Sequence, residues 1–469
     1  MEYSFKMMRR FIDQFYRRIL EPTDVASLVV FRVGFGILMF WEVTRFFYFG
    51  WVKDLFAKPQ FHFQYEWFTW VIPLPGYGMF LLFGGLGILA LMITLGLFYR
   101  FATILFFLGY TYVFLIDQAV YNNHFYLICL ISFILTLAPL QKSWSLDILR
   151  GSETHTDRLP ALWLWLIRFH IGIVYFYGGI AKFDPDWLAG LATRELMGKA
   201  NHGTIFQSLI EYPGVPQFYA WSGMIFDLCI PFLMLWKPIR KWAFLSVVLF
   251  HSYNNIVFPI GIFPILALFL TLLFFDADFP RKIIPKKVKR WLSREYRKRL
   301  LTLDNSNSEQ PDVVSRNLIS RFVMIFIGVY VIIHLLLPFR HLLYPGWTIW
   351  HQEGHFFAWR MMLRQKITRL QFNVTHPLTG EQRYADPGDY LNSSQFKAFG
   401  GNPAMILKFA HHLDHLVQSN TDFDPIISAR IEVSLNGRKF RQLVDPNLDL
   451  SKIPIHEPSY LWIKPFGKR

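Results

Sequence analysis

The feature that most constrains this chain is a series of apolar segments, each close to the length that a helix needs to cross a bilayer. A hydrocarbon core of about 30 Å is spanned by about 20 apolar residues in a helix. The chain has 469 residues, of which 53% are hydrophobic and 49 are phenylalanine, and one globular core cannot bury so many large side chains. We predict about nine transmembrane helices, at 26–49, 78–98, 101–118, 122–139, 161–182, 217–236, 242–257, 259–275 and 319–338.

Basic residues are distributed unevenly among the connections between these segments. The connections that carry them are Arg100, 140–160, 237–241 and 276–318, whereas those at 118–121 and 183–216 are poorer in basic charge. Because cytoplasmic loops carry an excess of Lys and Arg, the N-terminus is expected in the cytoplasm. A basic, amphipathic helix at 1–18 would lie on the inner membrane surface. The loop 276–318 fits attraction to anionic membrane lipids better than nucleic-acid binding.

The pattern changes after residue 340. Long apolar windows stop, and alternating runs such as "RIEVSLNGRKFRQLV" appear, with Asn436-Gly437 as a hairpin turn. The stretch "NPAMILKFAHHLDHLV" predicts one amphipathic helix. We therefore expect a transmembrane domain at 1–340, with 276–318 as its basic cytoplasmic loop. A small extracytoplasmic α+β domain would follow at 341–469.

Ionisable side chains inside the predicted spans form two sets. The first lies nearer the middle or inner side of the membrane and contains Arg32, Arg168, His170 and Asp227. Charges in hydrocarbon are kept when they are paired. We expect a structural role for this set, with an Arg168–Asp227 pair between helices.

The second set lies at the outer ends of the predicted helices. It contains Asp117, Asn122, Asn123 and His124 in "DQAVYNNHFYL", Lys182 in "GGIAKFDPDW", and His251, Asn254 and Asn255 in "FHSYNN". The last three share a helix face, at spacings of three and four residues. Each of these residues taken alone fits an ordinary structural role, such as a lysine that snorkels to the membrane surface or an asparagine that caps a helix. Together, at one depth, they indicate a site.

The chemistry of this site is constrained by the motifs that the sequence lacks. No Cys/His cluster, P-loop, dinucleotide motif or nucleophile elbow occurs in the sequence. His351, Glu353 and His355 alternate like ligands but lack a fourth partner, so we expect no metal. A lysine withdrawn from water could act as a general base, whereas Asp184 and Asp186 would favour its ammonium form. The balance between these effects is open at this point.

The neighbours of Lys182 extend this hypothesis. Gly178 and Gly179, one turn earlier, would leave room for a flat ligand against the helix. Histidine and asparagine donors could stabilise an oxyanion or hold a quinone-type ring.

These stretches together resemble the vitamin K-dependent γ-glutamyl carboxylase family, with an HTTM-type membrane domain. The similarity follows the chain in order, through "DQAVYNNHFYL", "IVYFYGGIAKFDPDWLAG", "FHSYNNIVFPIGIF", "WTIWHQEGHFFAWRMMLR" and "VSLNGRKFRQLVDPNLDL". The resemblance implies an integral membrane enzyme that oxidises vitamin K hydroquinone with O2 to the 2,3-epoxide. The strong base formed removes a proton from a peptide glutamate, which CO2 then carboxylates. The partners implied are a glutamate-containing peptide or protein and membrane lipids.

Roles for single residues follow from the same resemblance. Lys182 would be the base, and His124 the imidazole that orients or stabilises the reacting oxygen. The residues that would line the cofactor pocket are Asn123, His251, Asn254 and Asn255. The residues that would receive the glutamate segment are His355, Trp359 and Arg360, although His355 stands where animal members tend to have tyrosine.

Other departures concern the extent of the chain. The animal enzymes have a longer lumenal region, and they carry a cysteine pair that joins their membrane and lumenal parts. Here Cys129 and Cys229 both lie within predicted helices. These differences are typical of a compact bacterial member, whose external domain would face the periplasm; in a eukaryote it would face the lumen. The protein substrate, native quinone and oligomeric state stay open.

Three functions remain at this point. The first is carboxylation coupled to epoxidation. The second is epoxidation of the hydroquinone with little or no carboxylation. The third is a non-catalytic membrane protein that binds a quinone or lipid.

Overall fold

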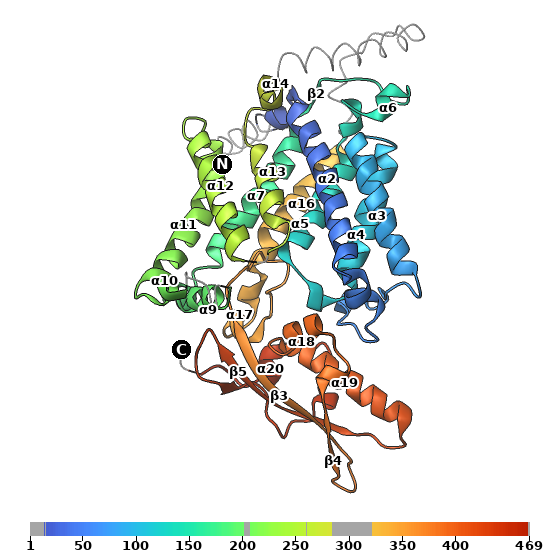
Figure 1. The fold of residues 1–469 in the computed structure, drawn as a ribbon, viewed down its shortest axis with the longest axis vertical. Coiled ribbons are helices and arrows are strands. Elements are labelled where there is room, and N and C mark those ends of the chain that lie inside the picture. Colours follow the sequence, from blue (N-terminus) through green and yellow to red (C-terminus); the bar gives the residue numbers. More distant parts are fainter. Residues whose placement is uncertain (1–13, 15, 201–206, 259, 284–320, 468–469) are drawn as a thin grey trace, which may run out of the picture.

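The computed structural model describes residues 14, 16–200, 207–258, 260–283 and 321–467. The predicted helix at 1–18 and the basic loop 276–318 lie mostly outside the described residues. Figure 1 shows a bundle of long helices, with a smaller unit of strands and helices against one end of it.

Each of the nine apolar ranges predicted from the sequence contains a helix. These helices are α2 (Ala26–Tyr48), α3 (Gly78–Leu95), α4 (Tyr99–Ile116), α5 (Asn123–Leu137), α7 (Leu162–Ile180), α11 (Val215–Leu235), α12 (Arg240–Val257), α13 (Phe263–Leu272) and α16 (Arg321–Leu336). Within the described residues, six are long and apolar enough to cross a membrane: α2, α3, α4, α7, α11 and the stretch Val323–Leu343 that includes most of α16. The helices α5 and α13 are shorter, so the number of nine spans stays a prediction.

Shorter elements connect these helices. They are β1 (Pro22–Asp24), a π-helical turn (Val52–Ala57), α6 (Leu146–Leu149), β2 (Arg158–Pro160), α8 (Pro185–Leu188), α9 (Leu191–Ala200), α10 (Gln207–Glu211) and α14 (Phe279–Ile283). Strands β1 and β2 pair antiparallel and join the start of α2 to the segment that precedes α7.

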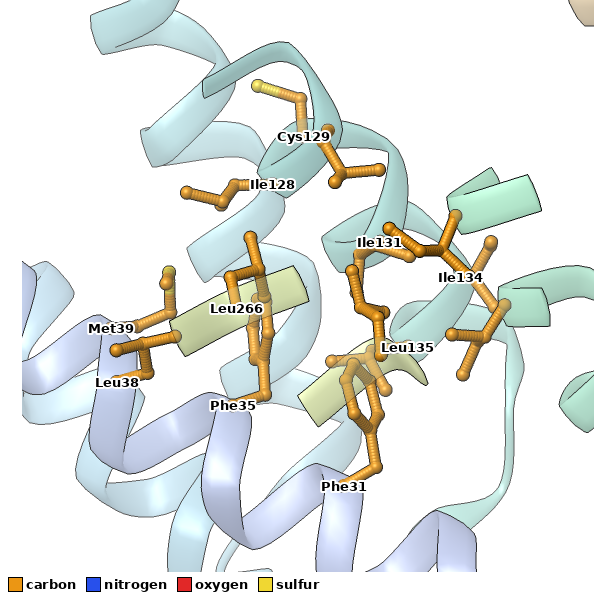
Figure 2. Packing of buried hydrophobic residues seen from close by; sticks show 14 of the residues in the cluster. Phe31, Phe35, Leu38, Met39, Ile128, Cys129, Ile131, Ile134, Leu135 and Leu266 are labelled. Atoms are coloured by element: carbon orange, nitrogen blue, oxygen red, sulfur yellow. The ribbon is translucent and has the colours of Figure 1, made fainter. Parts of the chain in front are cut away.

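The centre of the bundle is formed by α2, α5 and α13. Figure 2 shows Phe31 and Phe35 of α2 beside Ile131 and Leu135 of α5 and Leu266 of α13, and all five side chains are buried. Aliphatic and aromatic side chains that interdigitate in this way hold the helices by close packing.

The outer surface of the bundle is apolar as well. Leu81 and Ile88 of α3 are 75% and 63% exposed, and Leu249 of α12 is 62% exposed. A soluble protein rarely exposes so many large apolar side chains side by side. This surface therefore fits contact with lipid and supports an integral membrane protein.

Arg32 is fully buried inside this apolar bundle. Its guanidinium donates to the carbonyl oxygens of Leu140 (2.8 Å), Ser143 (3.2 Å) and Trp144. These bonds tie α2 to the segment between α5 and α6, and they solvate the charge in place of water.

The C-terminal unit contains a four-stranded antiparallel sheet in the order β4-β3-β5-β6. Its elements are α17 (Thr348–His351), β3 (Lys366–Thr375), β4 (Gln382–Ala385), α18 (Ser393–Phe399), α19 (Pro403–Asn420), β5 (Ile426–Leu435), β6 (Arg441–Gln442) and α20 (Ser459–Trp462). The predicted hairpin is confirmed: β5 pairs with β6 across Asn436 and Gly437, which both have positive φ. The predicted amphipathic helix is confirmed as α19.

One face of the sheet packs against α19. Ile427, Ile431 and Val433 of β5 point into a core that includes Met405 and Phe409 of α19. The strand alternates and the helix repeats every three to four residues, so each buries one apolar face.

The C-terminal unit contacts the helical bundle through polar side chains. Gln395 of α18 donates to the carboxylate of Asp117 (2.8 Å), which also contacts His62 (3.1 Å). Lys408 of α19 donates to the carbonyl oxygen of Gln64 (2.6 Å). Asp117, one of the polar residues at the predicted outer depth, therefore lies in the interface between the two units.

We expect Arg32→Met to lower the free energy of unfolding by about 3 kcal/mol, because several charge-assisted hydrogen bonds are lost and carbonyl oxygens are left unpaired. The measurement is thermal unfolding of the detergent-solubilised protein. Arg383→Met serves as the control, because this side chain is 80% exposed and pairs with Glu381 two residues away, so its effect should stay within about 0.5 kcal/mol. Equal effects of the two substitutions would contradict the role given to Arg32.

Candidate active site

A large cavity lies where one end of the helical bundle meets the C-terminal unit. Its volume is about 1210 Å³. The helices α2, α5, α7, α11 and α12 contribute to its walls, together with the segment 352–364 and α18. Pockets that hold small molecules usually measure about 300–1,000 Å³, so this cavity has room for a ring-shaped ligand and an amino-acid side chain together.

Lys182 lies at the wall of this cavity, just beyond the end of α7. It is only 7% exposed, and its ammonium forms an ion pair with the carboxylate of Asp227 on α11. The same amino group lies 3.3 Å from the carbonyl oxygen of Gly178 and 5.2 Å from the centre of the Trp187 ring. Lys182 is therefore held in place by its partners and does not extend outward as a snorkelling anchor.

The pairing predicted between Arg168 and Asp227 is wrong. Arg168 donates to the carbonyl oxygens of Leu273 (2.7 Å) and Phe275 (3.0 Å), just after α13. Carbonyl groups at the end of a helix lack intrahelical partners and accept from a nearby cation. This arrangement satisfies Arg168 and leaves Asp227 to Lys182.

The two aspartates that follow Lys182 act elsewhere. Asp184 caps α8 by accepting from the backbone amide of Asp186 (3.0 Å), and its other oxygen accepts from the indole of Trp347 (2.7 Å). Asp186 accepts from Asn436 (3.1 Å) and Arg438 (2.5 Å) in the β5–β6 hairpin. Both carboxylates therefore bind the C-terminal unit, and burial raises the pKa of Asp184.

Gly178 and Gly179 serve the contact between helices. A β-carbon on Gly179 would lie 2.7 Å from Leu228 of α11, and one on Gly178 would lie 3.5 Å from a carboxylate oxygen of Asp227. The space that we predicted for a flat ligand is thus filled by α11, whose close approach brings Asp227 to Lys182.

Several other polar residues predicted at this depth come together around the same cavity. His124 lines it beside the rings of Phe125 and Phe263. His251 lines it as well and is 2.6 Å from the hydroxyl of Tyr175. Asn123 and Asn254 are further lining residues, and the Asn123 side chain accepts from Tyr121 (3.1 Å).

Asn255 does not reach the cavity. It is exposed on α12, whereas Phe250, His251 and Asn254 are lining residues. Successive residues of a helix are about 100° apart, so Asn255 lies well round from Asn254. The sequence spacing predicted Asn255 in the pocket, but the rotation of α12 about its axis turns this side chain away from the cavity.

The segment after α17 supplies the part of the wall that belongs to the C-terminal unit. Of the three residues predicted to receive the glutamate segment, His355 and Arg360 line the cavity, but Trp359 does not. The Trp359 ring is 1% exposed and stacks on Tyr126, with ring centres 5.0 Å apart. Because this ring is buried in the apolar core, Trp359 cannot receive a substrate segment directly.

Buried cations gather at this part of the wall. Arg364 donates to the ring of His355 (2.6 Å) and to the side chain of Gln352 (2.8 Å). The Nε atom of Arg360 is buried and lacks a partner in the described part of the chain. Burial lowers the pKa of Arg360, and burial together with Arg360 lowers the pKa of Arg364 to about 10. Such a site suits a carboxylate ligand.

The sequence interpretation missed two charged residues of the cavity wall. Glu42 and Arg45 of α2 form a 2.6 Å ion pair, and Arg45 stacks over Trp51. A β-carbon on Gly261 would lie 3.5 Å from Arg45 and 3.9 Å from the Nε2 atom of His124, so these two side chains face one point. Their position inside a predicted span was a signal that could have identified them.

Within the described residues, no three His, Cys, Asp or Glu side chains come together as a metal site would require. The Nδ1 atom of His351 accepts from the amide of Glu353 (3.0 Å), and the Glu353 carboxylate accepts from the amide of Ser459 (2.8 Å). The alternating residues of "HQEGH" therefore have structural partners, and the absence of a metal stays a prediction.

Two family models match the chain. Residues 20–279 match the model of the HTTM domain, and residues 319–469 match the model of the vitamin K-dependent gamma-carboxylase lumenal domain. No solved structure matches the chain. The fold, the apolar surface and the first match define an integral membrane protein of the HTTM class.

With the lumenal-domain match added, the chain belongs to the vitamin K-dependent gamma-glutamyl carboxylase family, as its resemblance predicted. Membership indicates an enzyme of the vitamin K-dependent carboxylase type. It also implies vitamin K hydroquinone, O2 and CO2 as reactants.

We expect the stability of the C-terminal unit to fall below about pH 6.5. Burial lowers the pKa of His351 to about 4 and that of His355 well below its ordinary value. In this range the unfolded chain binds more protons than the folded one, so stability rises with pH from about 4 to about 6.5. Thermal unfolding at a series of pH values measures this. His351→Gln should reduce the slope, whereas His456→Gln, at an exposed side chain, should not.

Proposed function

We propose that this protein is an integral membrane vitamin K-dependent gamma-carboxylase, which oxidises the hydroquinone and carboxylates glutamate in a peptide. The observation that carries this proposal is the shared cavity. Lys182, His124 and His251 of the membrane bundle line it together with His355 and Arg360 of the C-terminal unit. A reaction that joins a lipid-soluble reductant to a peptide requires a site open to both.

The residues present fit a hydroquinone. The cavity has aromatic walls, among them Phe46, Phe125 and Phe263, against which a flat ring can pack. The buried His251 Nδ1 lacks a partner in the described part of the chain. When bound, reduced vitamin K would supply, on oxidation by O2 to the 2,3-epoxide, the strong base that removes the glutamate γ-proton before CO2 is added.

The side chains of this protein would bind, orient and move protons. Lys182 would take the proton from the hydroquinone hydroxyl. His124 would hold the reacting oxygen, and Asn123, His251 and Asn254 would orient the ring from the surrounding wall. Arg360, with His355 and Arg364 beside it, would neutralise the glutamate carboxylate, so that the γ-position faces the cavity.

The orientation in the membrane forms part of this proposal. The N-terminus would be cytoplasmic, nine helices would cross the membrane, and the domain at 341–469 would lie outside the cytoplasm. Support comes from the distribution of basic residues and from the position of the C-terminal unit at one end of the bundle.

The epoxidase without carboxylation stays the second candidate. Lys182, Asp227 and His124 all belong to the membrane bundle, so hydroquinone oxidation alone would require little of the C-terminal unit. A non-catalytic quinone- or lipid-binding protein would not require a base at Lys182, and it predicts that Lys182→Ala leaves function intact.

Purified protein supplied with reduced vitamin K, O2, labelled bicarbonate and a glutamate peptide should form epoxide and incorporate label. We expect Lys182→Ala to reduce epoxide formation by about 10²–10⁴-fold, the usual contribution of a general base. Lys237→Ala, at a side chain 77% exposed, is the control and should keep the original rate. Epoxide without label would favour the second candidate. If no epoxide forms, the proposed function is refuted. If Lys182→Ala forms epoxide at an unchanged rate, the assignment of Lys182 as the base is refuted.

Arg360→Gln should separate the two half-reactions. Loss of a charge-assisted hydrogen bond should raise the KM for the glutamate peptide about tenfold or more, while the KM for the hydroquinone stays near its original value. Steady-state assays with each substrate varied in turn measure this. Arg369→Gln, on the exposed face of β3, should leave both constants unchanged, and an equal rise in both constants for Arg360→Gln would contradict its assignment to the peptide.

A further inference from the structure

The ion pair of Lys182 raises a question about its function as a base. The ammonium contacts the Asp227 carboxylate, and both residues are almost fully buried, with 7% and 5% exposed. An ammonium has three N–H groups and no lone pair, so the ion pair cannot accept a proton at nitrogen. The base assigned to this cavity therefore requires a route by which Lys182 becomes neutral.

Other groups near the pair have partners of their own. Tyr175 of α7 lies near Asp227, and its hydroxyl is 2.6 Å from His251 of α12. Asp184 binds Trp347, Asp186 binds Arg438, and Arg360 faces Asp184. Among the described residues, Asp227 supplies the carboxylate that contacts the Lys182 amino group.

The surroundings of the pair favour a transfer within it. Two separate charges are costly in an apolar interior, so the free energy of an ion pair approaches that of the corresponding neutral pair. Because Gly178 has no side chain, Met361 and the Asp227 carboxylate both lie close to α7 there, within 3.5 Å of where a β-carbon would stand.

We propose that Asp227 is the proton acceptor that converts Lys182 into its neutral, basic form. This inference rests on the proposed function. One N–H bond of the ammonium breaks, an O–H bond forms on the Asp227 carboxylate, and the electron pair stays on the nitrogen. The neutral amine then accepts a proton from the hydroquinone. The products are an ammonium, a carboxylic acid and a hydroquinone anion, so the total charge is zero before and after.

The proposal has a consequence that does not involve the hydroquinone. A proton that moves inside the pair is not exchanged with water, so the fraction of neutral Lys182 is independent of pH until the pair as a whole gains or loses a proton. A lysine that must release its proton to water instead becomes more reactive with pH, by about tenfold per unit below its pKa.

The first measurement is the labelling rate of Lys182 in the full-length protein without hydroquinone. A small apolar isothiocyanate, which reacts with neutral amines, is supplied between about pH 5 and 9, within which a lysine with lowered basicity titrates. Mass spectrometry then quantifies the modified Lys182. We expect a constant rate in the original protein and a titration step in Asp227→Asn. Asp227→Glu, which restores a carboxylate, should again be constant.

The matched control is Asp276→Asn. This carboxylate is 51% exposed and pairs with Arg240, so its loss should leave the labelling of Lys182 constant. A titration step in the original protein, no labelling of it below pH 9, or identical profiles for the original protein and Asp227→Asn would each overturn the proposal.

The second measurement is epoxide formation over the same pH range. Asp227→Asn should lose about tenfold in rate for each pH unit below its own titration step, while the original protein and Asp227→Glu show no such step. Asp227→Asn with the original pH profile, or faster than the original protein at neutral pH, would show that Asp227 only restrains the lysine and would overturn the proposal. If the original protein forms no epoxide, the proposed function fails, whereas labelling still decides whether the pair exchanges its proton internally.

Discussion

The contact between Lys182 and Asp227 is the interaction on which the arrangement of the cavity depends. Taking a charge out of water into an apolar interior costs several kcal/mol, and an opposite charge offsets this only at close range. The close packing of α7 against α11 at Gly179 meets this requirement. The amino group is consequently held where two helices meet, at a position set by backbone packing. A reactive group fixed in this way needs little reorganisation when a ligand binds.

The same requirement explains the other charges in the bundle. Arg32 and Arg168 are each surrounded by backbone carbonyl oxygens, supplied by the segment after α5 and by the end of α13. The last carbonyl groups of a helix have no partner within the helix. An arginine placed there donates hydrogen bonds to these groups, and the same bonds stabilise its buried charge. His170 is also buried and has a partner in the hydroxyl of Tyr330, at 2.7 Å.

Much of the fold could be predicted because its signals are local. Apolar length located the helices, and the Asn436-Gly437 turn located the hairpin. Side chains of the site could be selected by their cost in a membrane, which identified Lys182, His124 and His251. Their partners could not be predicted, because whether Asp227 meets Arg168 or Lys182 depends on how α7 and α11 pack. The outward position of Asn255 and the burial of Trp359 depend equally on rotation and packing, which spacing alone does not determine.

The short helix α8 begins three residues after the buried lysine, and Asp184 and Asp186 at its start bind Trp347 and Arg438 of the other unit. Under the proposed function, this short stretch of backbone would join recognition of a peptide by the C-terminal unit to proton chemistry at Lys182. The C-terminal unit is therefore no exchangeable module. A chimera that takes this unit from a relative would need to keep the counterparts of Trp347 and Arg438, since otherwise two buried carboxylates would lose their partners beside the reactive amine.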